Sequence, residues 1–286
     1  MLTLLKIVVL GLIQGAAELL PVSSSAHVVV AEKLMGVDPS TPAAMFVLAM
    51  LHTGTMFAVL IYFWGAWKER YFSSRRRFAA VAGRAALATV ITGILGYALI
   101  KGIEVIFLKG GDVEQLARSL PLVAVSLVAS GAIILYAGAR RTETPAQRNS
   151  ELTPGHAAAM GLIQAVCLPF RGFSRSGATI SAGIVAGAGR RPSEEFSFAL
   201  AIILTPAVIV RELGRLVKLH PQALHRGGGL AHLVGPGFLG LGCSFLAGLL
   251  ALRWLSRWLE QGRWSYFGVY CLVAAAVVGV LAAKGF

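Results

Sequence analysis

Long apolar segments alternate with short polar ones along the chain, in a pattern typical of a membrane protein. The apolar stretches with few charges lie at 43–65, 79–100, 121–139, 196–210, 230–252 and 266–283. Because a helix needs ~20 residues to cross the hydrocarbon core of a bilayer, we expect each stretch to form one transmembrane helix, the shortest being 196–210. The pattern predicts an all-α, polytopic membrane fold with about six transmembrane helices.

Two further hydrophobic segments are interrupted. Pro21 breaks the segment at 2–35, Pro169 breaks the segment at 155–189, and polar side chains follow each proline. Backbone that leaves the helical conformation at membrane depth is tolerated only where protein or a water-filled cavity satisfies its polar groups. We therefore expect two re-entrant helix pairs whose polar turns are buried against each other.

The two interrupted segments carry similar polar cassettes. The first runs Gly11-Leu12-Ile13-Gln14, Glu18, Pro21 and Ser23-Ser24-Ser25-Ala26-His27, and the second runs Gly161-Leu162-Ile163-Gln164, Pro169 and Ser174-Arg175-Ser176-Gly177-Ala178-Thr179. The likeness continues, since Phe46–Ala49 matches Phe198–Ala201. We expect one membrane domain, residues 1–286, with internal repeats at 1–140 and 155–286. Each repeat would contain one re-entrant pair and three crossings. Because three is an odd number, the second repeat would lie upside down in the membrane relative to the first.

Composition agrees with a membrane protein and bears on its partners. Hydrophobic residues make up 56% of the chain and charged residues only 14%, against about 25% charged residues in soluble chains. The net charge is +13. Most of it lies at the edges of the apolar segments, where it fits the positive-inside rule better than a nucleic-acid partner.

The charges of the loops predict an orientation. Basic residues at 68–84 and 140–148 mark cytoplasmic loops, whereas loop 101–118 balances acidic and basic side chains and suits the outside. Both termini then lie outside. The basic residues within 211–226 oppose this scheme, because it places them outside as well.

The first cassette combines an acid, a hydroxyl and an imidazole. Gln14 and Glu18 are four residues apart and so share one face of a helix, where they can hold a cation or a water molecule. Ser24 and His27 lie one turn apart in the helix after Pro21, which places both beside Glu18. An ionisable group inside a membrane segment is costly unless a cavity or a partner compensates it, so Glu18 favours a functional site.

The serines of this cassette also suit a helix start. Ser23 or Ser24 is expected to cap a helix that runs to about Gly36, and the free amides of such a start form an anion site. A structural role is the alternative for Ser23, Ser25 and His27, because polar residues in membrane proteins often serve packing and backbone hydrogen bonding.

The second cassette adds a permanent cation, Arg175, at the start of another apolar helix. An arginine fork, neighbouring hydroxyls and helix amides are together typical of a phosphate or diphosphate clamp. The residues predicted for this clamp are Ser174, Arg175, Ser176 and Thr179, with Arg171 as a reinforcement. The alternative for Arg175 is a buried salt bridge with Glu18, which is compatible with a resting catalytic site.

These motifs resemble those of the bacterial undecaprenyl-diphosphate phosphatases of the bacitracin-resistance type. The resemblance rests on Gln14-x-x-x-Glu18, Leu20-Pro21-Val22-Ser23-Ser24-Ser25-Ala26-His27, Gly172-Phe173-Ser174-Arg175-Ser176-Gly177-Ala178-Thr179-Ile180-Ser181 and Ser193-Glu194-Glu195-Phe196-Ser197-Phe198. It spans nearly the whole chain. It implies an inner-membrane enzyme that hydrolyses the terminal phosphate of a C55 polyprenyl diphosphate, regenerating the monophosphate carrier of peptidoglycan synthesis, at a site that opens to the periplasmic side.

The resemblance also implies roles for individual residues. It places the family's essential acid at Glu18, its serine at Ser24, its histidine at His27 and its phosphate-binding arginine at Arg175. A divalent cation, Mg²⁺ or Ca²⁺, is expected on Glu18 with help from Gln14. Substrate binding is expected from Ser23, Ser25, Arg171, Ser174, Ser176 and Thr179. The sequence leaves open whether His27 activates Ser24 as a nucleophile or activates a water molecule.

The chain departs from the family's pattern at two positions. Gln14 stands where the family has Glu or Gln, which leaves one carboxylate there, and Phe170-Arg171-Gly172 replaces the usual Trp-Pro-Gly. A lipid-phosphate or anion transporter is the alternative function, because inverted repeats with broken helices are typical of secondary carriers. The expected partners are the polyprenyl diphosphate, the bilayer and a second copy of the chain in a homodimer.

Overall fold

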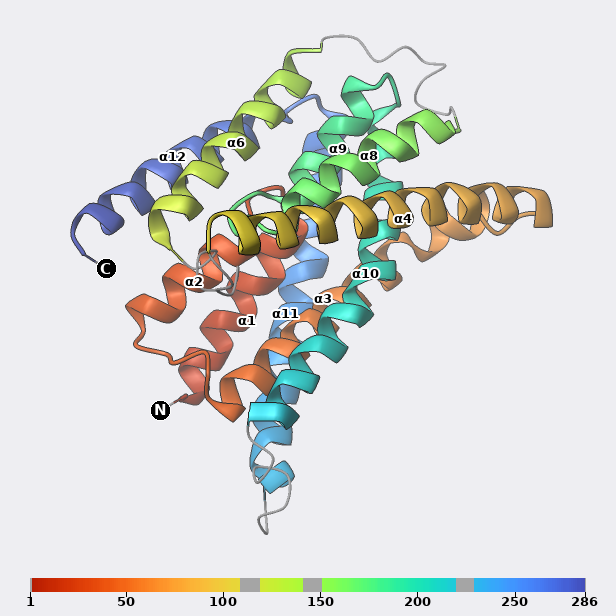
Figure 1. Cartoon of the computed structure of the whole chain (residues 1–286). Coiled ribbons are helices and arrows are strands. Elements are labelled where there is room, and N and C mark those ends of the chain that lie inside the picture. The colour runs from red at the N-terminus through yellow and green to blue at the C-terminus, as the bar shows by residue number, and fades with distance from the viewer. Residues whose placement is uncertain (1, 109–118, 141–150, 220–228, 286) are drawn as a thin grey trace.

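Helices are the only regular elements in the part of the chain that the computed structural model describes, residues 2–108, 119–140, 151–219 and 229–285 (Figure 1). They are α1 (Leu4–Leu19), α2 (Ser24–Leu34), α3 (Pro42–Arg70), α4 (Arg75–Ile106), α6 (Leu120–Ala139), α8 (Pro154–Cys167), α9 (Arg175–Val185), α10 (Arg190–Leu219), α11 (Gly229–Glu260) and α12 (Ser265–Ala283). The predicted all-α fold is confirmed. The loop charges at 109–118, 141–148 and 226 lie outside the described residues, and the predicted orientation stays a prediction.

Within the described residues, six helices are long and apolar enough to cross a membrane. They are α3, α4, α6, α10, α12 and the Val234–Glu260 part of α11. The six predicted crossings are confirmed, although the shortest, 196–210, belongs to a helix of 30 residues. This helix begins earlier because the carboxylates of its first turns are buried with partners. Ser256 donates a hydrogen bond to Glu194 at 2.5 Å, and Arg70 lies 3.1 Å from Glu195.

Each interrupted segment folds as two short helices, α1 with α2 and α8 with α9, which pack on each other. Leu20, the residue before Pro21, has extended backbone with φ −79° and ψ 152°, since a following proline disfavours the helical conformation. Helix α8 ends at Cys167, two residues before Pro169. At 16 residues or fewer, these helices are too short to span a bilayer. That they are re-entrant, and that the two halves are inverted, stays a prediction.

The two helix pairs begin and end with the same local chemistry. The side chains of Thr3 and Thr153 cap α1 and α8 by accepting a hydrogen bond from the backbone amide three residues on. Gly36 and Gly187 follow α2 and α9 with φ of 60° and 99°, a conformation that other residues rarely adopt. These glycines stop both helices after 11 residues and turn the chain into α3 and α10.

Glycines let the first helix of each pair approach a spanning helix. Gly161 of α8 packs on α4 so closely that an added Cβ would lie 2.6 Å from the carbonyl oxygen of Ala88. Gly15 of α1 packs in the same way on the backbone of Ser244 in α11. Helix association within a bilayer depends on close packing of this kind, because lipid tails are as apolar as the side chains. The contacts fix α1 and α8 within the bundle.

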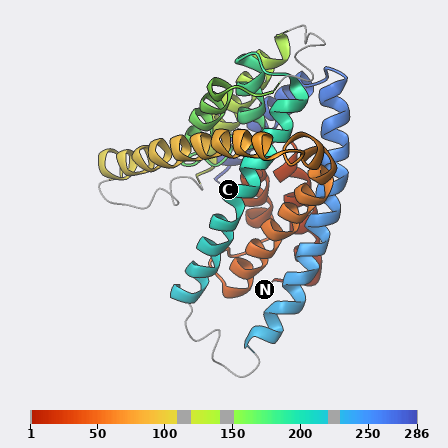
Figure 2. The ribbon, with the colours of Figure 1, turned by 90° about the vertical axis from the view of Figure 1, so that its right-hand side faces the viewer.

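The spanning helices surround the two pairs. Helix α3 packs against α10 and α11, and α6 packs along α12 (Figure 1). Helix α4 instead projects from the bundle (Figure 2) and contacts chiefly α8. The largest buried cluster includes Phe63, Trp67, Phe198 and Trp264. It joins α3, α10 and the start of α12 beside the polar turns, which holds those turns inside protein.

Candidate functional site

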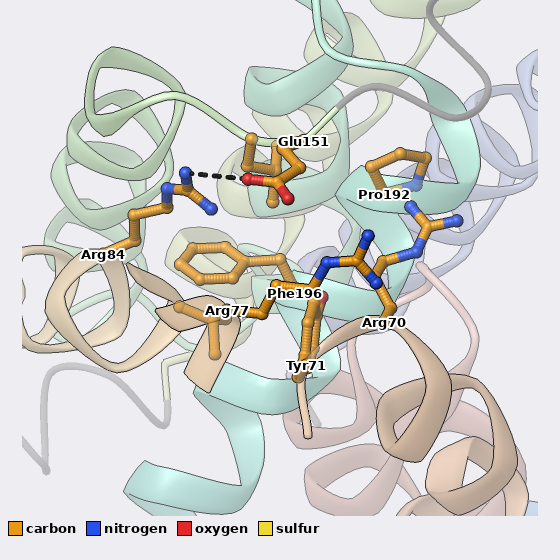
Figure 3. A pocket seen from close by; sticks show the side chains of 9 residues that line it. Arg70, Tyr71, Arg77, Arg84, Glu151, Pro192 and Phe196 are labelled. Atoms are coloured by element: carbon orange, nitrogen blue, oxygen red, sulfur yellow. Dashed lines mark hydrogen bonds and ion pairs between the residues drawn. The ribbon is translucent and has the colours of Figure 1, made fainter. Parts of the chain in front are cut away.

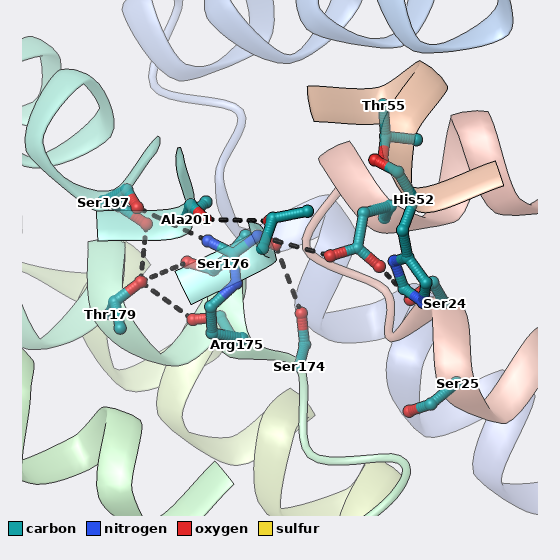
Figure 4. A network of polar contacts seen from close by, with 12 residues as sticks. Ser24, Ser25, His52, Thr55, Ser174, Arg175, Ser176, Thr179, Ser197 and Ala201 are labelled. Carbon is teal, nitrogen blue, oxygen red and sulfur yellow. Dashed lines mark hydrogen bonds and ion pairs between the residues drawn. The ribbon is translucent and has the colours of Figure 1, made fainter. Parts of the chain in front are cut away.

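The polar turns of the two helix pairs meet, with Arg175 of one pair facing Ser24 of the other (Figure 4). Glu18, near the end of α1, joins them. Its Oε2 accepts hydrogen bonds from Ser24 Oγ at 2.5 Å and from Gln14 Nε2 at 3.1 Å. Its Oε1 lies 3.5 Å from Nη2 of Arg175, and both side chains are 20% exposed. The two cassettes therefore lie together, and the ion pair that joins them is largely buried yet open on one side.

The first turn depends on an unusual backbone at Ser23. Its φ of 68° is the only positive value at a non-glycine residue in the described ranges, and such conformations cost of order 1–3 kcal/mol and cluster at functional sites. Ser23 Oγ caps α2 by accepting from the amide of Ala26 at 3.4 Å and lies 3.3 Å from Ser25 Oγ. Ser25 Oγ accepts from the amide of Gly172 in the other pair at 3.3 Å. These hydroxyls shape the turn and tie it to the second cassette.

Serine hydroxyls also hold the second turn. Ser174 caps α9, and its amide donates to Ser130 Oγ of α6 at 2.7 Å. Ser130 Oγ itself donates to the carbonyl of Gly172 at 3.3 Å. Ser176 Oγ donates to the carbonyl of Leu20 in the first turn at 3.2 Å. The hydroxyl of Ser176 is thus committed to joining the two turns, and the start of α9 is fixed beside Glu18.

Helix α10 orients the arginine of the second cassette. Arg175 Nη1 donates to the carbonyl of Ser197 at 3.4 Å, and the guanidinium lies over the ring of Phe198, 5.9 Å from its centroid. Thr179 Oγ1 donates to the carbonyl of Arg175 at 2.8 Å and lies 2.6 Å from Ser197 Oγ (Figure 4). Thr179 therefore ties the backbone of Arg175 to Ser197 of α10, and the arginine side chain directs its other terminal nitrogen, Nη2, at Glu18.

Both ring nitrogens of His27 have partners other than Glu18. Its Nδ1 lies 2.7 Å from the carbonyl oxygen of Ser23 and its Nε2 lies 2.7 Å from the hydroxyl of Tyr270 in α12. The imidazole stacks on the Tyr270 ring at 5.7 Å. A carbonyl only accepts, so Nδ1 carries the proton and Nε2 accepts from Tyr270. Ser24 lies beside Glu18 as expected, whereas the described contacts of His27 are with Ser23 and Tyr270.

Similarity to known sequences extends over nearly the whole chain and is not confined to the site motifs. The family model described as Bacitracin resistance protein BacA matches residues 7–277. The chain belongs to this family. Undecaprenyl-diphosphatase 2 of Acinetobacter baylyi is 52% identical over 98% of both chains. The undecaprenyl-diphosphatases of Desulforudis audaxviator and Desulfosudis oleivorans are 32% and 34% identical, over 96% and 94% of this chain and 96% and 95% of their own. With its six apolar helices, the chain is a multi-pass inner-membrane protein.

One histidine outside both polar cassettes, His52, also lies at the site of this BacA-family chain. His52, in α3, has its Nδ1 3.2 Å from Nε2 of Gln14, the amide that also donates to Glu18. Both interactions fit if the Gln14 amide donates to each partner, so that His52 Nδ1 is an acceptor. An ionisable side chain within an apolar span is itself a signal of function, and that signal could have identified His52.

The donor atoms around Glu18 bear on the divalent cation expected from the sequence. In the described part of the chain, no group of three or more His, Cys, Asp and Glu side chains could hold a metal ion. Glu18 offers two carboxylate oxygens and Ser24 a hydroxyl oxygen beside them. Gln14 offers its amide oxygen once the side-chain amide turns, because its Nε2 faces Glu18 in this structure. Because Mg²⁺ is commonly held by one or two carboxylates together with substrate phosphates, this set fits a cation that binds with a diphosphate.

An apolar pocket adjoins the site on the other side of His27. It lies between α1 and the ends of α11 and α12 that meet at their connecting turn. Leu20 and Val22, the residues before and after Pro21, form part of its wall. Aromatic rings form much of the remaining wall, from Trp254, Trp258, Tyr266, Phe267 and Tyr270. A pocket with this lining suits a hydrocarbon chain. Arg171 is partly exposed in the turn before α9, and its contact with a substrate stays a prediction.

Proposed function

We propose that this protein hydrolyses undecaprenyl diphosphate to the monophosphate and phosphate, and so returns the lipid carrier to peptidoglycan synthesis. One observation carries the proposal, the Glu18–Arg175 pair with Ser24 on the same carboxylate. It combines a cation for phosphate with an acid and a hydroxyl inside the membrane region. The relatives named undecaprenyl-diphosphatase share up to 52% of their residues with this chain over nearly full length, which supports the same reaction.

The diphosphate is proposed to bind between the starts of α2 and α9. Arg175 turns from Glu18 to the terminal phosphate, where its fork neutralises the oxygens that gain charge in the transition state. The free amides at the two helix starts add to this attraction. Ser174 and Ser176 fix the start of α9, and Ser23 and Ser25 fix that of α2. Catalysis here depends on positions that hydrogen bonds set before the substrate arrives.

Ser24 is the proposed nucleophile on the covalent route. Its hydroxyl donates to Glu18, so the carboxylate can take the proton as Oγ bonds to the terminal phosphorus. The bond from that phosphorus to the bridging oxygen then breaks, and the lipid monophosphate leaves. Water releases phosphate from the phosphoserine. The lipid monophosphate leaves as an anion, so this step needs no proton donor. His27 is proposed to activate the water molecule that attacks the phosphoserine, because its Nε2 carries no proton and accepts from Tyr270 until the substrate binds.

In the direct route an activated water molecule attacks phosphorus, and no phosphoserine forms. The presence of this intermediate therefore distinguishes the two routes. A phosphoserine trapped at Ser24 after rapid quenching supports the covalent route. Oxygen-18 from water enters the released phosphate on both routes, so a single turnover that incorporates it while no phosphoserine can be trapped supports the direct route. Both routes use Glu18 as the base that the geometry offers.

A divalent cation is proposed to bind on Glu18, with the oxygens of Gln14 and Ser24 as further ligands. When bound, Mg²⁺ or Ca²⁺ neutralises charge on the diphosphate. Hard cations prefer charged oxygen ligands, and a site with one protein carboxylate therefore depends on the substrate for its affinity. His52 holds the Gln14 amide, whose Nε2 donates to Glu18 and so orients this carboxylate ligand.

The apolar pocket beside His27 is proposed to receive the start of the prenyl chain. Its aromatic wall lies directly behind the first turn, so a lipid there presents its diphosphate to Glu18. We also propose that the site opens to the periplasmic side and that the two halves are inverted. A homodimer is proposed as well, since the apolar span of α4 is only 17% buried within the chain and leaves a lipid-facing surface for a second copy.

Phosphate release from polyprenyl diphosphate tests the proposal. The purified protein in detergent should release phosphate, and a chelator, Glu18→Ala and Arg175→Ala should each abolish most of the release. A lipid-phosphate transporter with the same architecture would bind the substrate and release no phosphate. Binding of intact substrate without turnover, in protein that remains folded, would overturn the proposal in favour of transport.

A further inference from the structure

A second polar pocket lies at the turn between α3 and α4, in residues that the proposed reaction does not use. Figure 3 shows the side chains of Arg70, Arg77 and Arg84 around this pocket, with the ring of Tyr71 below and Glu151 above. The turn joins two spanning helices, so the pocket lies at a membrane surface. It shares no residue with the site around Glu18.

Two buried donors in this pocket have no acceptor. The hydroxyl of Tyr71 and the Nη1 of Arg70 are buried, and neither makes a hydrogen bond within the described structure. Tyr71 is only 9% exposed, and burial raises the pKa of its phenol well above the ordinary value. The hydroxyl is therefore a donor at neutral pH. An unsatisfied buried donor costs about 1–3 kcal/mol, which points to a ligand with acceptor oxygens.

The charges around the pocket leave a net attraction for an anion. Arg70 pairs with Glu195 through Nε, and Arg84 pairs with Glu151, 58% exposed, at 3.3 Å. Arg77 donates to the hydroxyl of Ser73 at 3.0 Å, and the described residues give it no carboxylate partner. The guanidinium of Arg77 can therefore bind a ligand, next to the unpaired Nη1 of Arg70 and the hydroxyl of Tyr71.

The surroundings place the ligand at the depth of lipid headgroups. Phe72 of this turn stacks on Phe78 with ring centroids 5.6 Å apart, and its ring also lies 6.0 Å from that of Trp64 in the last turns of α3. The side chains of Trp64, Phe72 and Phe78 are 56%, 48% and 49% exposed. Exposed aromatic side chains at the end of a span face the interfacial region of a bilayer, and arginine forks bind phosphate oxygens there.

We propose that the pocket formed by Arg70, Tyr71, Arg77 and Arg84 binds a phosphate group, with Arg77 and the Tyr71 hydroxyl as its main ligands. A lipid headgroup and free inorganic phosphate both carry this chemistry. The site is separate from the reaction centre, and its occupation does not depend on the proposed phosphatase activity.

The test uses the full chain in two arms, each with Arg77→Gln, Tyr71→Phe and the matched control Arg76→Gln. Arg76 is exposed, lies on the same helix turn and does not line the pocket. In the first arm, the thermal unfolding midpoint is titrated with inorganic phosphate at constant ionic strength, in an Arg175→Ala background that removes the catalytic clamp. In the second arm, protein from vesicles of phosphatidylcholine and phosphatidylglycerol is weighed by native mass spectrometry to count retained phosphatidylglycerol.

We expect Arg77→Gln to weaken binding by about tenfold, and Tyr71→Phe by about fivefold, since each removes a hydrogen bond to phosphate oxygen. Arg76→Gln should match the parent. A response in the phosphate arm identifies free phosphate as the ligand, and a response in the lipid arm identifies the headgroup. If both pocket variants match Arg76→Gln in both arms, the proposal is wrong. Both changes are small, and Tyr71→Phe keeps the buried ring, so folded protein is expected for each variant.

Discussion

Arg175 and Glu18 are 157 positions apart in the chain, and their side chains form an ion pair at 3.5 Å. Removing one partner of such a pair leaves an uncompensated charge in a low-dielectric site. The pair also keeps a cation directed at the serine turn. In the proposed mechanism, an entering diphosphate takes the place of the carboxylate on the guanidinium, and Glu18 then acts on Ser24.

The first prediction concerns the fork of Arg175. Arg175→Lys keeps the positive charge but loses the planar set of donors that reaches Glu18 and the carbonyl of Ser197 at once. We expect kcat/KM for polyprenyl diphosphate to fall about 100-fold, within the range for loss of a transition-state donor. Phosphate release measures it. Arg140→Lys, at an exposed helix end, is the control, and equal activities of the two variants would show that a point charge suffices.

The turn residues could be predicted because their signals are local. Gln14 and Glu18 share a helix face by spacing alone, and Ser23 caps α2 as the sequence indicates. The convergence of the two turns followed from the repeated cassettes. Polar turns at membrane depth require a buried partner, and the only comparable segment in the sequence was the second copy.

The partners supplied by spanning helices could not be predicted in the same way. Ser130, His52 and Tyr270 lie in apolar stretches, and each reaches the site only through the packing of its helix. No spacing rule relates Tyr270 to His27 across 243 positions. Sequence spacing gives the position of His27 one turn after Ser24 on α2, but its ring bonds Tyr270 of α12 and not the expected neighbour, Glu18.

The second prediction concerns the hydrogen bond between Tyr270 and His27. Tyr270→Phe removes the hydroxyl and keeps the ring that stacks on the imidazole. We expect kcat to fall about fivefold, as one hydrogen bond to His27 is lost, and KM to stay unchanged. Tyr266→Phe is the matched control, because Tyr266 lines the same pocket without contacting His27. A rise in KM with kcat intact would instead assign Tyr270 to binding of the prenyl chain.

The third prediction concerns His52 and the metal. His52→Leu leaves the amide of Gln14 without its second acceptor, so that the amide is no longer held in one orientation beside Glu18. Loss of a residue that orients a metal ligand typically costs 10–100-fold in affinity. We expect the Mg²⁺ concentration for half-maximal phosphate release to rise about tenfold.

The neighbouring residue provides the comparison for His52. Thr53→Val removes a hydroxyl that donates only to the carbonyl of Ala49 in the same helix, and its Mg²⁺ dependence should equal that of the parent. An unchanged Mg²⁺ dependence in His52→Leu, together with lower kcat, would move His52 from metal support to a part in proton transfer.

The fourth prediction concerns the stability of the second helix pair. Gly161→Ala puts a methyl group 2.6 Å from the carbonyl oxygen of Ala88. The methyl carbon is fixed to the backbone of α8 and the oxygen belongs to the backbone of α4, so neither can move without its helix. Overpacking of this kind costs typically 1–3 kcal/mol, so we expect a lower midpoint of thermal unfolding in detergent. The control is Gly93→Ala in α4, the helix that α8 packs on. Gly93 has open space around it, so this change should not lower the midpoint, because alanine favours the helix. Equal midpoints for the two variants would mean that α8 can shift on α4, and the start of α9, which α8 holds in place, would then not be fixed beside Glu18 by this contact.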